Sequence, residues 1–217
     1  MLHLTKKISI NQDIKMKTGD KMKEKLSILA IALVLFATSC KKEPIAHAKI
    51  DKTPYETREC IKELSLGNEI NYNALIDKII VYKKDRKLYA YRKGKIVEEF
   101  RISLGKNGDK GDKLMAGDYK TPEGSYNIIR KKCDSRLYRS LMISYPNKAD
   151  KEMAEQMGVN PGGYITIHGQ PKWNASGEGD EYTLSNDWTE GCIAITNKAM
   201  DKLWMAVKNG VIIEIYS

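Results

Sequence analysis

Hydrophobic and polar residues alternate along several short stretches of the chain, and this period of two predicts β-strands. Three such stretches, at residues 79–82, 87–91 and 96–103, follow one another with short polar or glycine-containing turns between them. Turns of this kind join antiparallel neighbours, so the three stretches predict a β-meander. Further strand patterns lie at residues 126–129 and 141–145, in the segment ending at residue 168, directly after residue 192, and at 211–216.

Hydrophobic residues at helical spacing are found in fewer places. A short helix is expected from Asp150 to Met157, and another follows residue 192, with an apolar face of Met200, Leu203, Trp204 and Val207. Together the elements predict a mostly β domain with two or three short helices.

A weaker helical pattern lies between Tyr55 and Asp77, with Ile61, Leu64 and Leu66 as candidate buried positions. The pattern leaves open whether this segment packs against the domain. Residues 170–187, in contrast, are polar and rich in Gly, Asn and Ser, which predicts a long loop. We expect this loop to form a lid or wall over a groove.

Charge and composition describe an ordinary globular protein. The 217 residues are 41% hydrophobic and 30% charged, and the formal net charge is +9. Residues 1–39 contain seven Lys and three acidic residues, so the remainder carries 30 basic against 25 acidic residues, a net of +5. This excess suits either anionic cell-wall polymers or a solvated surface. No basic stretch is interleaved with aromatic residues, so nothing indicates nucleic-acid binding.

One cysteine and one histidine stand out as candidate chemistry. Cys192 lies in Thr-Glu-Gly-Cys-Ile, and His168 ends Tyr-Ile-Thr-Ile-His. A thiol is a strong nucleophile only as thiolate, and an imidazole is well suited to take its proton. Gly191 allows close backbone approach, and N–H groups beside the nucleophile could hold an oxyanion. A lone Cys or His is more often structural, but the surrounding residues favour a catalytic pair.

These residues resemble a motif of the YkuD-type L,D-transpeptidases, cysteine enzymes of bacterial peptidoglycan. The motif is a His, a spacer, then Ser or Thr, a second His, Gly, Cys, a hydrophobic residue, and Asn or Arg. His168, Thr189, Gly191, Cys192 and Ile193 match it in order. Glu190 replaces the second His, Ala194 replaces Asn or Arg, and the spacer is a few residues longer.

A second stretch carries the same resemblance. Residues 117–126, Gly-Asp-Tyr-Lys-Thr-Pro-Glu-Gly-Ser-Tyr, resemble the Gly-Asp…Thr-Pro-x-Gly-x-Tyr loop found upstream in this family. The likeness covers roughly residues 78–217 and implies a β-sandwich or open barrel with an active-site cleft at one end.

The resemblance also implies roles for individual residues. Cys192 is the expected nucleophile and His168 the general base, oriented by the carbonyl of Gly169. Backbone donors near Gly191 and Cys192 are expected to stabilise the oxyanion, and Thr189 to shape the turn. A carboxylate pointing at the thiol would raise its pKa, so we expect Glu190 to face solvent or a cationic group.

The implied reaction is acyl transfer on peptidoglycan tetrapeptide stems through a thioester, giving 3→3 cross-links. Two alternatives stay open at this stage. The first is a peptidoglycan hydrolase or amidase on the same scaffold, because water can resolve the same thioester. The second is a non-catalytic wall-binding lipoprotein. No cofactor is expected.

The N-terminal residues predict export. From Met22, two Lys precede the apolar run from Leu26 to Phe36, which is too short to span a membrane. Small residues before Cys40 resemble a lipobox, so we expect lipidation of Cys40 and a membrane anchor there. An uncleaved anchor is the alternative. The predicted protein is a cell-envelope lipoprotein facing the periplasm, on the outer or cytoplasmic membrane.

The expected organisation is therefore an upstream extension (1–21), a signal peptide (22–39), a tether and N-terminal segment (40–77) and a catalytic domain (78–217). No cysteine pair has the spacing of a zinc site, and no metal is expected. With Cys40 acylated and Cys192 catalytic, Cys60 and Cys133 remain as a candidate disulfide. This bond would fasten the N-terminal segment to the domain.

Overall fold

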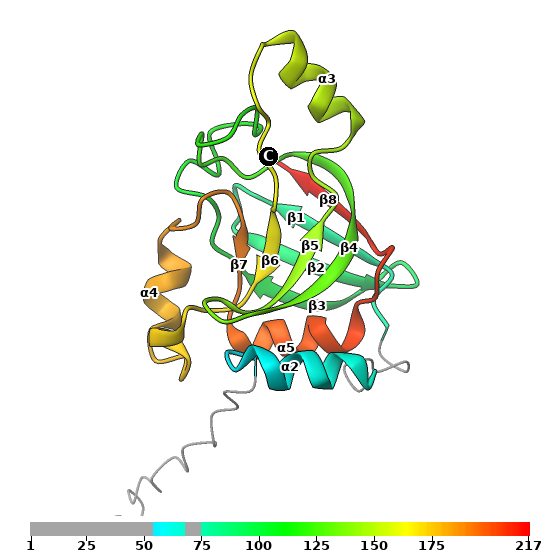
Figure 1. Ribbon diagram of the computed structural model, residues 1–217, viewed down its shortest axis with the longest axis vertical. Helices are drawn as coiled ribbons and strands as arrows, with labels where there is room; N and C mark the ends of the chain where they lie inside the picture. Colours follow the sequence, from blue (N-terminus) through cyan, green and yellow to red (C-terminus); the bar gives the residue numbers. More distant parts are fainter. Residues whose placement is uncertain (1–53, 68–74) are drawn as a thin grey trace, which may run out of the picture. The chain divides into compact units, whose positions relative to one another are not determined.

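The computed structural model describes residues 54–67 and 75–217, and its described strands form one eight-stranded sheet (Figure 1). The predicted extension, signal peptide and lipidation site at Cys40, with the tether up to residue 53, lie outside the described residues. The sheet order is β3-β2-β1-β8-β4-β5-β6-β7. The strands are β1 (Lys78–Tyr82), β2 (Lys87–Arg92), β3 (Lys95–Arg101), β4 (Gly124–Asp134), β5 (Tyr138–Ile143), β6 (Thr166–His168), β7 (Ile193–Ala194) and β8 (Ile212–Tyr216).

Four short α-helices accompany the sheet in the described part of the chain, against two or three expected. They are α2 (Thr57–Ser65), α3 (Lys148–Gln156), α4 (Asp180–Ser185) and α5 (Asn197–Ala206), with one 3-10 turn, η2 (Lys172–Asn174). The helix without a predicted counterpart is α4. Within these described residues, none of the helices is long and apolar enough to cross a membrane.

The order of the strands brings the chain's last strand into the centre of the sheet. The predicted meander is confirmed, because β2 pairs antiparallel with both β1 and β3. β8 then pairs parallel with β1 and antiparallel with β4. It thereby joins the meander to β4, β5, β6 and β7, so the two sequence halves share one sheet.

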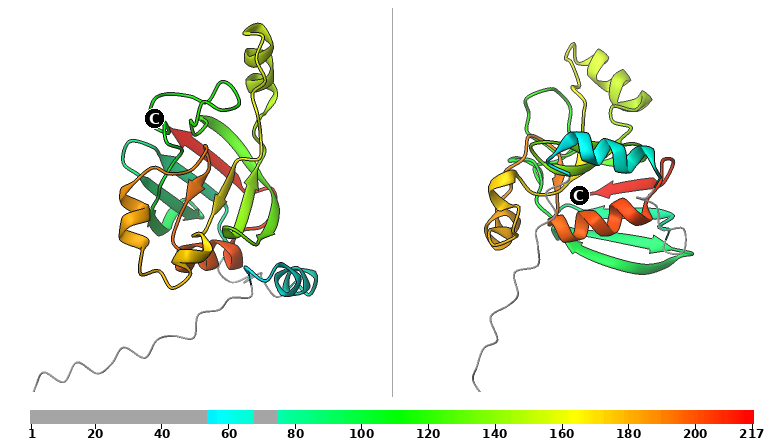
Figure 2. Two further views of the ribbon diagram at one scale, coloured as in Figure 1. Left: turned by 60° about the vertical axis from the view of Figure 1, so that its left-hand side comes forward. Right: turned by 60° about the horizontal axis from the view of Figure 1, so that its bottom comes forward.

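The sheet curls until the chain leaving β3 meets β7 at the opposite edge (Figure 2). Ser103 and Ala194 exchange backbone hydrogen bonds of 2.9 and 2.8 Å, and Gly105 forms a bridge with Thr189. Few unpaired edges are left by such closure. The mostly β, open-barrel fold expected from the sequence is confirmed.

The core follows the hydrophobic pattern that predicted the elements. Ile79 and Val81 of β1 are fully buried, as the strand alternation requires. The predicted apolar face of α5 is likewise fully buried. Its Thr196 N-cap accepts a hydrogen bond from Ala199 N, which satisfies one of the free N–H groups at the helix start.

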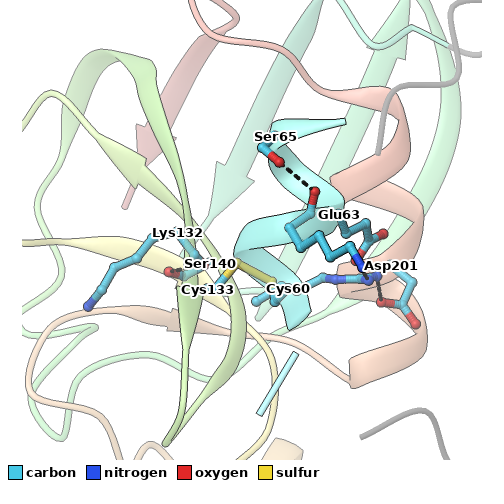
Figure 3. The surroundings of a disulfide bond; sticks show 9 residues. Cys60, Glu63, Ser65, Lys132, Cys133, Ser140 and Asp201 are labelled. Carbon is cyan, nitrogen blue, oxygen red and sulfur yellow. Dashed lines mark hydrogen bonds and ion pairs between the residues drawn. A yellow bond between two sulfur atoms is a disulfide. The ribbon is translucent and has the colours of Figure 1, made fainter. Parts of the chain in front are cut away.

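Helix α2 packs on the domain, but not through the residues predicted to be buried. Ile61 and Leu66 are 55% and 63% exposed, and Leu64 is only partly buried. The fully buried residue is Cys60, which forms a disulfide with Cys133 of β4 (Figure 3). The predicted disulfide is thus present, and it decides which face of α2 turns inward.

Candidate active site

Cys192 and His168 lie on neighbouring strands. His168 ends β6, Cys192 directly precedes β7, and these strands pair in parallel with Ile167 opposite Ile193. Residues two apart on a strand share a face. The pairing therefore places Thr166, His168 and Cys192 on one face, from two segments separated by a long connection.

Cys192 carries a half-buried thiol whose pKa is lowered from its ordinary value. Burial acts in the opposite direction, because it disfavours the charged thiolate. Hydrogen bonding and charge from His168 outweigh it, and the hydroxyl of Thr166, with Oγ1 3.6 Å from Sγ, lowers the pKa further. The thiolate is therefore more populated near neutral pH than in an unperturbed cysteine.

His168 is buried and held in one orientation. Its Nδ1 lies 2.7 Å from the carbonyl oxygen of Gly169, as the family resemblance led us to expect. A carbonyl only accepts, so Nδ1 carries the proton and Nε2 of the neutral ring has none. The ring also packs against Trp188 edge-on, with 5.6 Å between centroids. His168 is thus arranged to accept a proton through Nε2.

Thr189 shapes the turn that precedes Cys192, as expected. Its hydroxyl donates to the carbonyl of Cys192 at 2.7 Å and accepts from the N–H of Gly191 at 3.2 Å. The Gly191 N–H was a candidate oxyanion donor from the sequence. In this structure that N–H group already donates to the Thr189 hydroxyl within the turn.

Gly191 is required by packing. Its φ is +128°, and a Cβ at this position would lie 2.7 Å from the carbonyl oxygen of Lys120. Gly105 is equally confined, because its Cβ would lie 2.9 Å from Gly191 Cα and 2.1 Å from Tyr119 O. The two stretches that carry the family resemblance therefore pack backbone against backbone beside the nucleophile.

The upstream stretch folds around the carboxylate of Asp118. Lys113 Nζ donates a hydrogen bond to this carboxylate at 2.7 Å. The backbone N–H groups of Leu114, Met115 and Lys120 also donate to it. Burial raises the pKa of Asp118, but Lys113 and the backbone donors lower it by more. The ionised carboxylate therefore organises the loop that borders Gly191.

Lys83 supports the turn at residues 121–124 that follows this loop. Its fully buried Nζ donates to the carbonyls of Gly111 and Thr121, both at 2.8 Å, and to Glu123 at 2.9 Å. The Thr121 hydroxyl in turn accepts from Gly105 N at 3.1 Å. Through these bonds Lys83, directly after β1, supports the backbone packed against Gly191.

A cavity of about 590 Å³ opens above Cys192. Its walls come from the 113–119 loop, the β4–β5 turn, the chain leading into β6 and the nucleophile turn. The lining residues are Lys113, Ala116, Gly117, Tyr119, Arg136, Leu137, Gly162, Gly163, Tyr164, Ile165, His168, Trp188, Thr189, Glu190 and Cys192.

The prediction that residues 170–187 form a lid or wall of the groove is wrong. None of them lines this cavity, and the segment folds into η2 and α4 instead of a loop. The Ser103 hydroxyl donates to the carbonyl of Thr183, and Asn174 donates to Asp180 at 2.9 Å. The first contact holds the segment against the closed edge of the barrel, and the second joins η2 to the start of α4.

The two positions that depart from the family motif are accommodated differently. Glu190 is exposed at the border of the cavity, so the expectation that it faces solvent is confirmed. Ala194 is fully buried between His168 and Ser103, its partners in the sheet.

Three residues that contact Cys192 or His168 were not predicted from the sequence. Thr166 donates to the thiol, Tyr164 offers its carbonyl oxygen at 3.8 Å from Sγ, and Trp188 packs on the imidazole. Thr166 could have been found from its spacing, because it lies two residues before His168 on the same predicted strand.

Cys192 and His168 thus form a cysteine–histidine pair on neighbouring strands of a curled sheet, at the base of a cavity. Residues 76–215 match the model of the YkuD family, the L,D-transpeptidase catalytic domain, and the chain belongs to this family.

Similar proteins include one described as "Putative L,D-transpeptidase YafK" from Escherichia coli (strain K12), 29% identical over 140 residues. The match covers 62% of this chain and 48% of that protein, so the chain spans about half the length of this curated relative.

Among solved structures, the helical cell shape determining protein Pgp2 from Campylobacter jejuni is 30% identical, with a TM-score of 0.49 over 72% of this chain and 55% of that one. An L,D-transpeptidase from Xylanimonas cellulosilytica is 17% identical, with a TM-score of 0.41 over 72% and 68% of the two chains.

Proposed function

We propose that the chain is a cysteine acyltransferase that acts on peptidoglycan tetrapeptide stems and forms 3→3 cross-links. The observation that carries this proposal is a half-buried Cys192 whose pKa is lowered against the effect of burial by His168. Family membership supports the choice of substrate. Arg136 and Glu190 at the cavity border suit a peptide that carries both carboxylates and amines.

In the proposed reaction, His168 Nε2 takes the thiol proton and the thiolate attacks the carbonyl of the third stem residue. The backbone N–H of Cys192 stabilises the oxyanion, since the N–H of Gly191 donates to Thr189. The bond to the terminal D-Ala then breaks, and His168 returns the proton to the leaving amine. An amine of a neighbouring stem attacks the thioester and releases Cys192.

Mass spectrometry of products from disaccharide-tetrapeptide tests this proposal. We expect cross-linked dimers with release of D-Ala, and a loss of about 100-fold or more in rate for His168→Asn. Cys192→Ser serves as the inactive control. Trimmed monomers would show that the protein is a hydrolase and not a transferase. Unchanged substrate would show that it only binds the cell wall.

We also propose that the chain is exported and lipidated at Cys40, and that it faces the periplasm from the outer or cytoplasmic membrane. The short apolar run and the small residues before Cys40 support this. Membrane fractions of expressing bacteria should contain the wild type with an added lipid mass. Cys40→Ser should lose that mass, and recovery of an unlipidated wild type would contradict the proposal.

A further inference from the structure

The turn after His168, whose Gly169 carbonyl orients the imidazole, is held in place by the buried side chain of Gln170. Gln170, two residues after His168, is fully buried. Its backbone N–H donates to Asn197 Oδ1, and its Nε2 donates to the carbonyl of Ile195, both at 2.7 Å. Ile195 N donates back to the carbonyl of His168 at 2.9 Å. The Gly169–Gln170 peptide is thereby fixed on the side facing α5.

Tyr55, in the N-terminal segment, binds the next peptide of the same turn and the Asn197 side chain. Its hydroxyl donates to the carbonyl of Gln170 at 2.7 Å and accepts from Asn197 Nδ2 at 3.0 Å. Its ring is 4% exposed and packs on Tyr138, with 5.1 Å between centroids. Tyr138 confines the turn further, because a Cβ on Gly169 would lie 2.9 Å from Tyr138 Cβ.

The helix that follows Tyr55 is anchored at two points (Figure 3). Cys60 is linked to Cys133, and Glu63 pairs with the buried guanidinium of Arg139 at 2.6 Å. Arg139 also pairs with Asp201 of α5 at 2.7 Å, while its backbone carbonyl accepts from Gly169 N at 3.1 Å. The position of the segment that carries Tyr55 is therefore fixed partly through Arg139, which also contacts Gly169.

We propose that Tyr55 is a positioning residue for His168. Its hydroxyl holds the Gln170 carbonyl and the Asn197 amide that binds Gln170 N. The Gly169 carbonyl thereby stays within hydrogen-bond distance of His168 Nδ1, and the imidazole stays aimed at Cys192. Tyr55 lies outside residues 76–215, the part matched by the family model, so it is an addition to the catalytic domain. The proposal rests on the proposed function only through the pairing of Cys192 with His168.

Tyr55→Phe in the full chain tests this role, because it removes only the hydroxyl. The readout is the rate of Cys192 alkylation by iodoacetamide against pH, followed by peptide mass mapping. We expect the midpoint pH to rise toward that of His168→Asn, and the turnover of tetrapeptide to fall several-fold with KM unchanged. Tyr216→Phe is the matched control, since its hydroxyl bonds Glu214 on β8, and it should leave the profile unchanged.

A spectroscopic measurement separates positioning from simple docking of α2. The full chain has three histidines, and the ring resonances of His168 are identified in an NMR spectrum as those missing from His168→Asn. The Nδ1 proton, bonded to Gly169, should exchange faster with water in Tyr55→Phe at a temperature where the variant is folded. A lower melting temperature with unchanged Nδ1 exchange and unchanged alkylation profile would overturn the proposal.

The alkylation assay contains no substrate, so the two proposals fail separately. A shifted alkylation profile in Tyr55→Phe supports the positioning role even if the wild type does not react with tetrapeptide. In that case only the proposed substrate is contradicted. A wild-type profile that does not move in His168→Asn overturns the pairing, and with it the role of Tyr55.

Discussion

At the residue scale, the reactivity of Cys192 depends on a balance between burial and two neighbours. Burial raises the thiol pKa, and His168 and Thr166 lower it by more. Because the folded pKa lies below the ordinary value, alkylation of the wild type should reach half its maximal rate at a lower pH than alkylation of a free cysteine.

Thr166→Val should move this midpoint upward. The substitution keeps the shape of the side chain but removes the hydroxyl that donates to sulfur at 3.6 Å. The rise should be smaller than in His168→Asn, because His168 contributes more to the lowering. Thr166→Ser keeps a donor and should stay near the wild type. An identical profile for Thr166→Val would show that the hydroxyl does not act on the thiolate.

Gly191→Ala should destabilise the protein and abolish the turn geometry. The new Cβ would lie 2.7 Å from the backbone oxygen of Lys120, at a φ of +128°. We expect a loss of more than about 3 kcal/mol in the free energy of unfolding, from strain and overlap together. Gly210→Ala is the matched control, since its φ is +91° with nothing within 4 Å of a Cβ. Equal urea midpoints for the two variants would contradict the packing argument.

At the element scale, the lysine directly after the first strand supports the loop beside the nucleophile. Lys83→Met should lower the free energy of unfolding by about 3–5 kcal/mol, because it leaves buried carbonyls and the Glu123 carboxylate without their cation. Lys84→Met changes an exposed neighbour and should stay within about 0.5 kcal/mol. Urea denaturation compares them, and a neutral Lys83→Met would refute the supporting role.

Elements with a strong hydrophobic period could be predicted from the sequence, and elements held by tertiary contacts could not. The strands and α5 follow their pattern because one face of each is buried. Helix α4 has only six residues and no side-chain cap at Gly179, so neither its length nor a capping residue predicts it from the sequence. Asn174, which bonds both Gly179 N and Asp180, supplies the missing support from outside the helix.

The candidate site shows the same division. Cys192 and His168 could be predicted because their chemistry and spacing match a family motif. The roles of Lys83 and Tyr55 could not, because the side-chain partners of these residues lie 28 to 142 residues away in the chain. A buried lysine is also rare enough that sequence alone argues against expecting one.

At the scale of the whole molecule, one covalent link fastens the N-terminal helix to the sheet. Cys60 and Cys133 are 73 residues apart, and closing a loop of this length stabilises the folded state by about 4 kcal/mol in the chain-entropy account. Reductant should therefore lower the melting temperature by about 10 °C. The Cys60→Ala, Cys133→Ala double variant should melt at the same temperature with and without reductant. A wild type insensitive to reductant would contradict the stabilising role of the bond.

The contact of Gly105 with Gly191 joins positions 86 residues apart, on chain segments that meet only when the barrel closes. Pairings this distant in sequence form late in folding, because the intervening chain must first be ordered. A newly made molecule would then carry a sulfhydryl with the reactivity of a free cysteine until its final closure. The rise of thiol reactivity above that of a free cysteine should accordingly follow the appearance of secondary structure in a refolding experiment, and it should mark the moment at which the molecule is complete.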